Sequence, residues 1–239
     1  MQNLSIFVKR FTTVIRYGLM TLQYAGLRVT FNKFLHQLND RTVFFGVIMP
    51  IAKLNVHSSF DCIVNLASPE EAKDFFRHIY KEKRESRYEL LVRKWFYERG
   101  FRNLYIARTV DTNEPCNIRW VITSQDIQNT GYQDLYPKLK DDEFMTENIY
   151  TLEKFRRMGV QGASLRPVYE LMYKKGYRWD IGYIAEDNIP NLKSNKKLGK
   201  LVFEKIEERH FLFRVKRKTL KRYDPPIPIF IPGEDYTYR

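Results

Sequence analysis

A strand, a glycine-bearing loop, a helix and a second strand follow one another in the second half of this 239-residue chain, and this order constrains the fold most. Phe144–Leu152 (FMTENIYTL) alternates as a strand does. The loop at 156–163 (RRMGVQGA) leads into a helix predicted over Ser164–Lys175, which Gly176 ends. Trp179–Ala185 is the second predicted strand. This succession predicts an α/β domain.

Helix-start and turn signals predict the elements that flank this unit. Ser68-Pro69-Glu70-Glu71 combines an N-cap serine, a proline at the first helical position and a glutamate three residues after the cap. The turn-forming residues 111–115 join two strand-like runs and predict a β-hairpin. The elements expected are a strand over Arg41–Ile48, helical sequence from Ser68 to about Arg99 with a break near Glu85-Ser86 and a C-cap at Gly100, hairpin strands Leu104–Val110 and Cys116–Thr123, a helix Ile189–Leu198 ended by Gly199, and two strands within Lys200–Lys218.

Other stretches predict no regular element. Residues 49–67 show no clear period, and residues 126–142 are polar and loop-like. The proline-rich tail from Tyr223 to Arg239 is expected to be extended and to add no core of its own. The predicted organisation is a helical extension over 1–40, one mixed α/β domain over 41–218 and an extended tail over 219–239.

The charge of the chain is strongly positive. Lys and Arg number 41 against 28 Asp and Glu, a net charge of +13. This favours an anionic partner: nucleic acid, a membrane surface, an acidic acyl-carrier protein or a phosphate-bearing ligand. Nucleic acid is not expected, because the chain lacks the interleaved aromatic and basic residues of RNA-binding modules. A basic run at 214–222 is typical of a solvated face or a protected edge strand.

Cysteine and histidine usage gives no sign of a metal site. Cys62 and Cys116 form no CxxC motif, and the four histidines lack ligand spacing. We therefore expect no metal. Two cysteines without a disulfide framework fit a reducing, cytoplasmic compartment.

Residues 4–38 contain five Lys or Arg and no acidic residue. Arg16 and Arg28 interrupt every apolar stretch long enough for a signal peptide or a membrane span. Two interpretations stay open: a basic amphipathic helix lying on the anionic inner leaflet of a membrane, and one or two helices packed on the domain. The helical apolar stripe behind both is Phe7, Phe11, Val14, Ile15, Leu22, Ala25 and Val29.

The loop at 156–163 has the physical properties of an anion site. A helix N-terminus presents unpaired N–H groups and the positive end of the helix dipole. Glycines allow close approach of a phosphate, and Arg156 and Arg157 add charge. The alternative is that Gly159 and Gly162 only form the turn between strand and helix. Neither a Rossmann fingerprint nor a P-loop is present.

The residues that follow complete a recognisable pattern. After the strand Trp179–Ala185 come Glu186-Asp187-Asn188-Ile189-Pro190-Asn191 and then Lys196-Lys197-Leu198-Gly199. Together with the Arg-x-x-Gly loop, residues 143–200 resemble the GNAT acyltransferase superfamily, and the resemblance extends plausibly back to Phe101. It implies a mostly antiparallel sheet flanked by helices, with a β-bulge that splays the strand before the loop from its neighbour.

The resemblance also implies acetyl-CoA or another acyl-CoA as co-substrate. In that superfamily the loop binds the pyrophosphate, and the strand before it contributes backbone groups to the pantetheine arm. Carried over to this chain, the residues are Tyr150, Thr151, Leu152, Arg156, Arg157, Met158, Gly159, Val160, Gln161, Gly162, Ala163, Asn188 and Asn191.

Three positions depart from the superfamily pattern. Gln161 occupies the place of a small residue in the loop. The tyrosine that often protonates the departing thiolate is replaced by Asn195, and Lys200 replaces the usual phenylalanine. Binding of acyl-CoA is therefore implied more firmly than a standard catalytic set.

A carboxylate before the loop would be the natural base for deprotonating an amine. Glu143 and Glu147 are the candidates, and strand alternation puts both on one face. The alternative is that either is a solvated strand carboxylate. Tyr150 is predicted on the opposite face, while Tyr183 and Ser194 are secondary candidates for a proton donor.

Several functions remain open at this stage. The first is direct N-acyl transfer from an acyl-CoA to an amine, for which a similar layout in bacterial surface-polysaccharide enzymes suggests an amino sugar. The second is long-chain transfer from acyl-carrier protein to an amino acid or amine, and the third is a catalytically degenerate binding protein. Edge strands near the C-terminus could pair in a homodimer.

Overall fold

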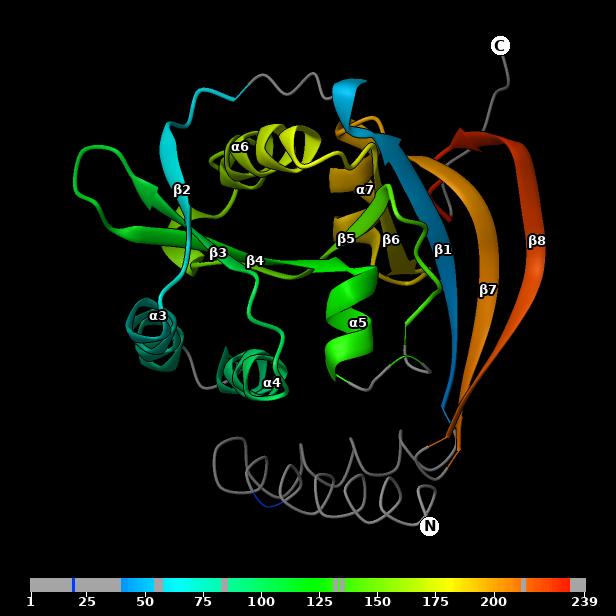
Figure 1. Ribbon diagram of the computed structural model, residues 1–239, viewed down its shortest axis with the longest axis horizontal. Coiled ribbons are helices and arrows are strands. Elements are labelled where there is room, and N and C mark those ends of the chain that lie inside the picture. Colours follow the sequence, from blue (N-terminus) through cyan, green and yellow to red (C-terminus); the bar gives the residue numbers. More distant parts are fainter. Residues whose placement is uncertain are drawn as a thin grey trace.

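Eight strands form one sheet in the order β2-β3-β4-β5-β6-β1-β7-β8 (Figure 1). The computed structural model describes residues 19, 40–53, 58–82, 86–130, 133, 136–211 and 214–232. The strands are β1 (Asp40–Pro50), β2 (Cys62–Leu66), β3 (Leu104–Thr109), β4 (Pro115–Thr123), β5 (Glu143–Thr151), β6 (Trp179–Ala185), β7 (Leu201–Phe211) and β8 (Arg214–Pro228).

Helices cover the two faces of the sheet. Figure 1 shows α3, α4 and α5 on one side of the sheet and α6 on the other. The helices are α3 (Pro69–Lys81), α4 (Ser86–Glu98), α5 (Ser124–Thr130), α6 (Val160–Lys174) and α7 (Ile189–Lys197), with short 3-10 turns η1 (Ile51–Lys53) and η3 (Glu153–Phe155). Because side chains alternate along each strand, they point either to the face that carries α6 and α7 or to the face that carries α3, α4 and α5.

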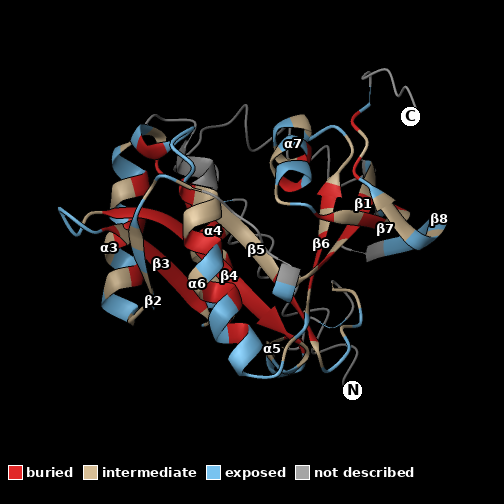
Figure 2. Cartoon of the chain, turned by 90° about the horizontal axis from the view of Figure 1, so that it is seen from above, coloured by how far each residue is buried: buried red, intermediate tan, exposed pale blue. Residues whose placement is uncertain are grey.

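Each helix group packs on its own apolar cluster. Phe75 and Ile79 of α3 pack with Ile118 and Trp120 of β4. Leu165 and Tyr169 of α6 pack against Phe144 and neighbouring strand residues on the other face. Leu192 of α7 lies in a third cluster with β1, β6 and β7 residues. Figure 2 shows the buried positions concentrated in the central strands and in the helix surfaces that face them.

β5 and β6 are parallel neighbours that separate along their length. Their pairing covers Glu143–Met145 against Trp179–Ile181 and then stops. Beyond that point β5 stays paired with β4 but carries one extra residue, because Trp120 pairs with Glu147 whereas Ile118 pairs with Tyr150. Asn148 lies in this bulge with φ 49°. The predicted mixed, mostly antiparallel sheet with a bulge and a splayed strand pair is confirmed.

The structure also corrects the sequence predictions. The stretch 126–142 is not all loop, because α5 covers its first residues, and 49–67 contains η1 and β2. α6 begins at Val160 rather than Ser164. The predicted break between α3 and α4 and the C-cap at Gly100, with φ 99°, are confirmed.

The C-terminal segment contributes to the core, contrary to expectation. β8 continues to Pro228, pairing with Leu201 of β7, and this delivers the following residues to the third cluster. Ile229 and Ile231 are 1% and 3% exposed, and the Phe230 ring lies 4.6 Å from that of Phe45. The expected helix within 4–38 falls outside the described residues, apart from Leu19.

Candidate active site

The separation of β5 from β6 opens a cavity of about 810 Å³. Its walls come from β5, β6, the first turn of α6, α7 and α4. The residues that line it include Arg93, Thr146, Glu147, Tyr150, Thr151, Arg156, Gln161, Gly182, Tyr183, Asn188, Asn191, Ser194, Asn195 and Lys200. The cavity therefore lies where two strands end their pairing and two helices begin.

The entrance is bordered by the N-terminus of α6. Gly159 is its N-cap with φ 81°, and it has no side chain to cap the first turn. The backbone of Arg157 is also left-handed, with φ 67°. A helix begun in this way presents its first N–H groups to a ligand. A Cβ at Gly159 would lie 2.8 Å from Ser58 Oγ, so a side chain there would force the Ser58 hydroxyl to move.

Gln161 joins the two helices that border the cavity. Its side-chain Oε1 accepts a hydrogen bond from Ser194 Oγ of α7 at 3.0 Å. Its backbone oxygen accepts from the Arg119 guanidinium at 2.8 Å. Gln161 thus has a structural role that a glycine at this place in the loop could not have.

Arg119 supports the first turn of α6 from below. The side chain is buried on β4 and donates to Ser164 Oγ at 2.5 Å as well as to Gln161. Its Nε and Nη1 have no hydrogen-bond partner among the described residues. Burial lowers the pKa of Arg119 to about 10, an effect that Tyr169 and Asp180 oppose. A buried cation adds to the positive potential of this helix terminus.

The bulged part of β5 is held by polar side chains. Arg93 of α4 donates to Ile149 O at 3.0 Å, and Arg156 donates to Thr151 O at 3.1 Å. Tyr150 OH donates to Glu82 Oε2 at 2.5 Å. The strand edge facing β6 beyond Met145 has no strand partner in the described chain, and side chains bond to several of its backbone groups instead, Asp180 to Thr146 N among them.

Glu147 lines the cavity on the face of the sheet that carries α3 and α4. Burial raises its pKa to about 7, and Asp180 adds to this whereas the N–H of Asn148 and the charge of Lys200 oppose it. A carboxylate with a pKa near neutrality can accept a proton from an amine and release it again. Of the two candidates for the base, Glu147 both lines the cavity and has a pKa near neutrality.

Glu143 lies elsewhere. It accepts a hydrogen bond from the backbone N–H of Lys140 at 2.9 Å and pairs with the Lys140 ammonium at 3.2 Å. It does not line the cavity. The structure therefore gives it a role in fixing the start of β5.

The sequence-predicted binding residues divide into two groups. Tyr150, Thr151, Arg156, Gln161, Asn188 and Asn191 line the cavity together. Leu152, Arg157, Met158, Gly159, Val160, Gly162 and Ala163 form the loop and first helical turn at its edge without lining it. Sequence reasoning missed Asp180, although it lies on the predicted strand Trp179–Ala185, and it missed Arg93 and Arg119, which lie far from the motif in sequence and reach it only through the fold.

The two secondary candidates for a proton donor, Tyr183 and Ser194, are engaged with neighbours, as is Asn195 at the usual tyrosine position, and Ser194 Oγ donates to Gln161 Oε1. Tyr183 OH donates to Glu204 Oε1 at 2.6 Å, and burial and this hydrogen bond raise the pKa of Tyr183. Asn195 Nδ2 donates to Asn191 O at 2.9 Å.

Among the described residues no cluster of side chains could hold a metal ion, and none of the described helices is long and apolar enough to cross a membrane.

No family model and no curated protein matches this sequence. Solved structures do. A fungal structure described as a GCN5-related glucosamine N-acetyltransferase region of a multi-domain GH3 β-N-acetylglucosaminidase matches with TM-score 0.54 and 11% identity, over 77% of this chain and 23% of that one.

Two further structures match less closely. One is a GCN5-related N-acetyltransferase from Sphaerobacter thermophilus, with TM-score 0.46 and 10% identity over 83% of this chain and 58% of that one. The other is a tandem GNAT protein from the clavulanic acid biosynthesis pathway, with TM-score 0.45 and 12% identity over 77% of this chain and 55% of that one. The chain spans less than two thirds of each of these structures. At 11% identity the likeness to the fungal structure shows the fold alone, and together with the splayed β5–β6 pair it shows that this chain has the fold of the GNAT acetyltransferases.

Proposed function

We propose that the protein is an N-acyltransferase that moves an acyl group directly from an acyl-CoA to an amine. The single observation that carries the proposal is the cavity at the β5–β6 separation, which joins an anion-binding helix terminus to a carboxylate with a pKa near 7. A binding protein would need the first of these features. A transferase acting on an amine needs both.

The donor would enter along β5. Its pyrophosphate would lie at the first turn of α6, near Arg156, where helix N–H groups and a guanidinium meet. From Thr151 to Thr146 the strand runs about 17 Å at the usual rise per residue, a length along which an extended arm would lie. The thioester would then lie at the inner end, where Thr146 and Gly182 line the cavity.

The amine would approach from the face of the sheet that carries α3 and α4. Glu147 lines the cavity there and would accept the proton that the amine loses during attack on the thioester carbonyl. Transfer would be direct, so the chain needs no nucleophile of its own. Acetyl is the acyl group proposed first, and longer chains are an alternative.

The acceptor that we propose is an amino sugar of a surface glycoconjugate. Arg93, Glu147 and Tyr150 give this side of the cavity polar groups, as recognition of a sugar requires. The description of the fungal structure names glucosamine, although that likeness concerns the fold. An amino acid or amine acylated from acyl-carrier protein is the second candidate, favoured by the exposed lysines of β8, which would attract an acidic carrier.

Ligand binding measured by calorimetry and thermal shift tests the proposal. CoA at a hundred times its Kd should stabilise the protein by about 2.7 kcal/mol. Thiol release from acetyl-CoA with a panel of amino sugars and amines would then identify the acceptor. CoA binding without thiol release from any acyl donor would favour the degenerate binding protein, and absence of CoA binding would refute both.

A matched pair of arginine variants locates the phosphates. Arg156→Gln should weaken CoA binding about tenfold and leave binding of phosphate-free pantetheine unchanged. Arg166→Gln removes an exposed arginine of α6 that pairs with Glu170 at 3.2 Å and lies outside the cavity, so its Kd should equal that of the wild type. Equal losses for CoA and pantetheine in Arg156→Gln would contradict the assignment.

A further inference from the structure

A buried ion pair lies at the inner end of the cavity. Lys200 Nζ donates to Asp180 Oδ2 at 2.6 Å, and the two side chains are 5% and 0% exposed. Such a pair contributes little to stability, because desolvation of both charges offsets their attraction. The pair places a charged donor, the Lys200 ammonium, at the wall of the cavity.

Asp180 is fully engaged, whereas Lys200 is not. The carboxylate of Asp180 also accepts hydrogen bonds from Tyr169 OH, from Thr146 N at 3.2 Å and from Thr146 Oγ1. Lys200 has three N–H donors, and Asp180 is the acceptor that the described residues provide for one of them. Two donors remain on an ammonium group that lines the cavity.

Gly182 and Lys200 are neighbours in the lining of the cavity. Pairing between β5 and β6 ends at Met145 and Ile181, and the next residue of β6 is Gly182. A Cβ built at Gly182 would lie 4.0 Å from Lys200 Nζ and 3.5 Å from Val47. Gly182 and Lys200 both line the cavity, so the ammonium lies beside the point at which the strands separate.

We infer that Lys200 is a catalytic residue of the proposed transfer, where its ammonium stabilises the negative charge on the departing CoA sulfur and on the carbonyl oxygen. The inference rests on the proposed function and names the group that replaces a hydroxyl acid in this chain. Tyr183, Ser194 and Asn195 are engaged with Glu204, Gln161 and Asn191. Asp180 is a positioning residue that holds Lys200 through the ion pair.

Transfer from an acyl-CoA thioester to an amine forms one C–N bond and breaks one C–S bond. The amine lone pair forms the C–N bond, the carbonyl electrons move to oxygen, and Glu147 takes one N–H proton. The C–S bond then breaks, and its electron pair leaves on sulfur as a thiolate beside the Lys200 ammonium. The thiolate is protonated by water on release, and Glu147 returns its proton to solvent.

The acidity of bound CoA tests this without an acceptor. The thiol pKa of CoA held in the cavity is read from the ultraviolet absorbance of the thiolate as pH is raised. An opposite charge at contact distance lowers a pKa by about 1–3 units, so the bound thiol should titrate that far below the ordinary value of about 8.5. In Lys200→Met this lowering should vanish.

A second variant guards against loss of folding, because Lys200→Met leaves a buried carboxylate unpaired. Lys200→Met combined with Asp180→Asn removes both charges and should fold, while the thiol pKa still returns to that of free CoA. Lys197→Met changes an exposed lysine at the end of α7 that does not line the cavity, and should behave as the wild type.

Affinity provides an independent readout. Lys200→Met should weaken CoA about tenfold and desulfo-CoA less than about twofold, since only CoA has the sulfur. If CoA bound to the wild type and CoA bound to Lys200→Met have the same thiol pKa, the role of Lys200 is overturned while the proposed function stands. Failure of the wild type to bind CoA would overturn the proposed function and this inference together.

Discussion

Glu147 and Tyr150 are three residues apart on β5, yet both face the side of the sheet that carries α3 and α4. Strand alternation predicts opposite faces for them, but Glu147 pairs with Trp120 and Tyr150 with Ile118, and these two β4 residues share one face. The extra residue in the bulge at Asn148 accounts for the difference. The bulge thus puts Glu147 and the anchored Tyr150 on the same wall of the cavity.

Replacing Glu147 tests the base. Glu147→Gln should lower kcat by about 10²–10⁴, the usual contribution of a general base. In the wild type, log kcat/KM should rise with pH and level off above about 7, because the pKa of Glu147 is raised to about 7 and the ionised form is active. Glu143→Gln is the control and should keep the wild-type rate and profile, since Glu143 bonds to Lys140 outside the cavity. A wild-type profile in Glu147→Gln would exclude this residue as the base.

The same raised pKa has a consequence for stability. Ionising Glu147 costs folding free energy as pH rises from its ordinary value of 4.5 towards 7. Glu147→Gln should therefore be more stable than the wild type above pH 7, by about 1–2 kcal/mol after allowance for water in the cavity. Below about pH 4.5 the two proteins should unfold at equal urea concentrations, and urea titrations at pH 4 and 8 measure both points.

Asn148 tolerates a left-handed backbone that few residues adopt. With φ 49°, a β-branched side chain is strained, so Asn148→Val should lower the free energy of unfolding by about 1–3 kcal/mol. Asn148→Gly should stay within about 0.5 kcal/mol of the wild type. Equal stabilities of the two variants in urea unfolding would contradict the strain argument.

The fold and the cavity differ in how far the sequence predicts them. Hydrophobic alternation, the cap at Ser68 and the glycines at the ends of helices are local signals, and they predict most of the strands and helices correctly. β2 escaped prediction because Ile63 and Leu66 are exposed at the sheet edge, and so no buried face marks it. Local signals also predict the loop before α6, whereas Arg93 and Arg119 reach the site through contacts 56 and 42 residues away in sequence.

Gly159 and Gly176 both have left-handed backbones, so comparing their alanine variants distinguishes backbone strain from loss of ligand binding. Gly159 has φ +81° and Gly176 has φ +97°, so alanine at either should cost about 1–2 kcal/mol in unfolding free energy. A Cβ at Gly159 also meets Ser58 Oγ, whereas nothing lies within 4 Å of one at Gly176. Gly159→Ala should weaken CoA binding about tenfold, and Gly176→Ala should leave the Kd unchanged. A similar Kd for both variants would remove the loop from the proposed phosphate site.

Replacing Arg119 should weaken ligand binding without lowering stability by more than about 1 kcal/mol. Arg119→Met removes a buried cation whose Nε and Nη1 lack partners among the described residues, while Ser164 Oγ keeps its hydrogen bond to Asn117 Oδ1 at 3.0 Å. The free energy of unfolding should stay within about 1 kcal/mol or rise. CoA affinity should fall about tenfold, because Gln161 loses its support and the helix terminus loses a charge. Parallel calorimetry and urea unfolding distinguish this from simple loss of structure, in which both quantities would fall.

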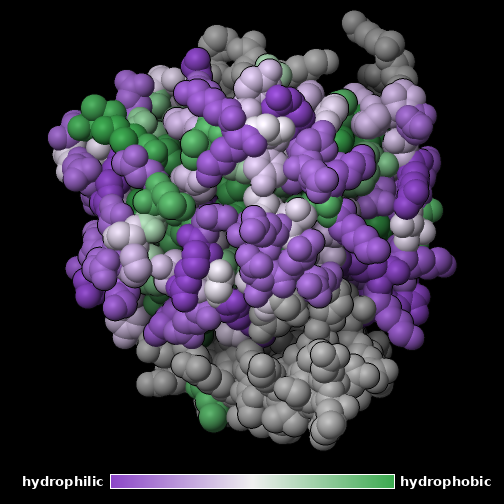
Figure 3. All heavy atoms as spheres, in the orientation of Figure 1, coloured by the Kyte–Doolittle hydropathy of each residue, from purple (hydrophilic) through white to green (hydrophobic). Residues whose placement is uncertain are grey.

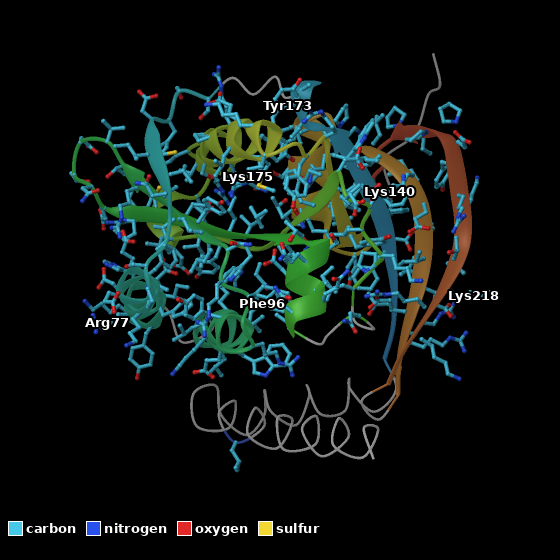
Figure 4. All side chains as sticks on the ribbon, viewed as in Figure 1. Arg77, Phe96, Lys140, Tyr173, Lys175 and Lys218 are labelled. Atoms are coloured by element: carbon cyan, nitrogen blue, oxygen red, sulfur yellow. The ribbon has the colours of Figure 1, made fainter. Side chains whose placement is uncertain are left out.

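Glu207 holds together a group of cations on one face of the β1–β7–β8 edge. Arg41 pairs with Arg209, and Arg209 pairs with Lys216, so three positive side chains lie in one cross-strand row. Glu207 is 3% exposed and forms ion pairs with both arginines. Figure 3 shows a hydrophilic surface along this edge, and Figure 4 shows Lys218 on β8 pointing outward from it.

Removing that carboxylate should expose the repulsion between the cations. Glu207→Gln should lower the free energy of unfolding by about 1–3 kcal/mol at low salt, since like charges directly opposite one another on a sheet destabilise it. Salt should recover part of the loss, because the arginines are more than half exposed and screening acts on exposed charges. Glu170→Gln is the control, as its exposed pair with Arg166 should contribute about 0.5 kcal/mol or less. If the loss in Glu207→Gln is the same at low and high salt, the cause is a lost hydrogen bond and not charge repulsion.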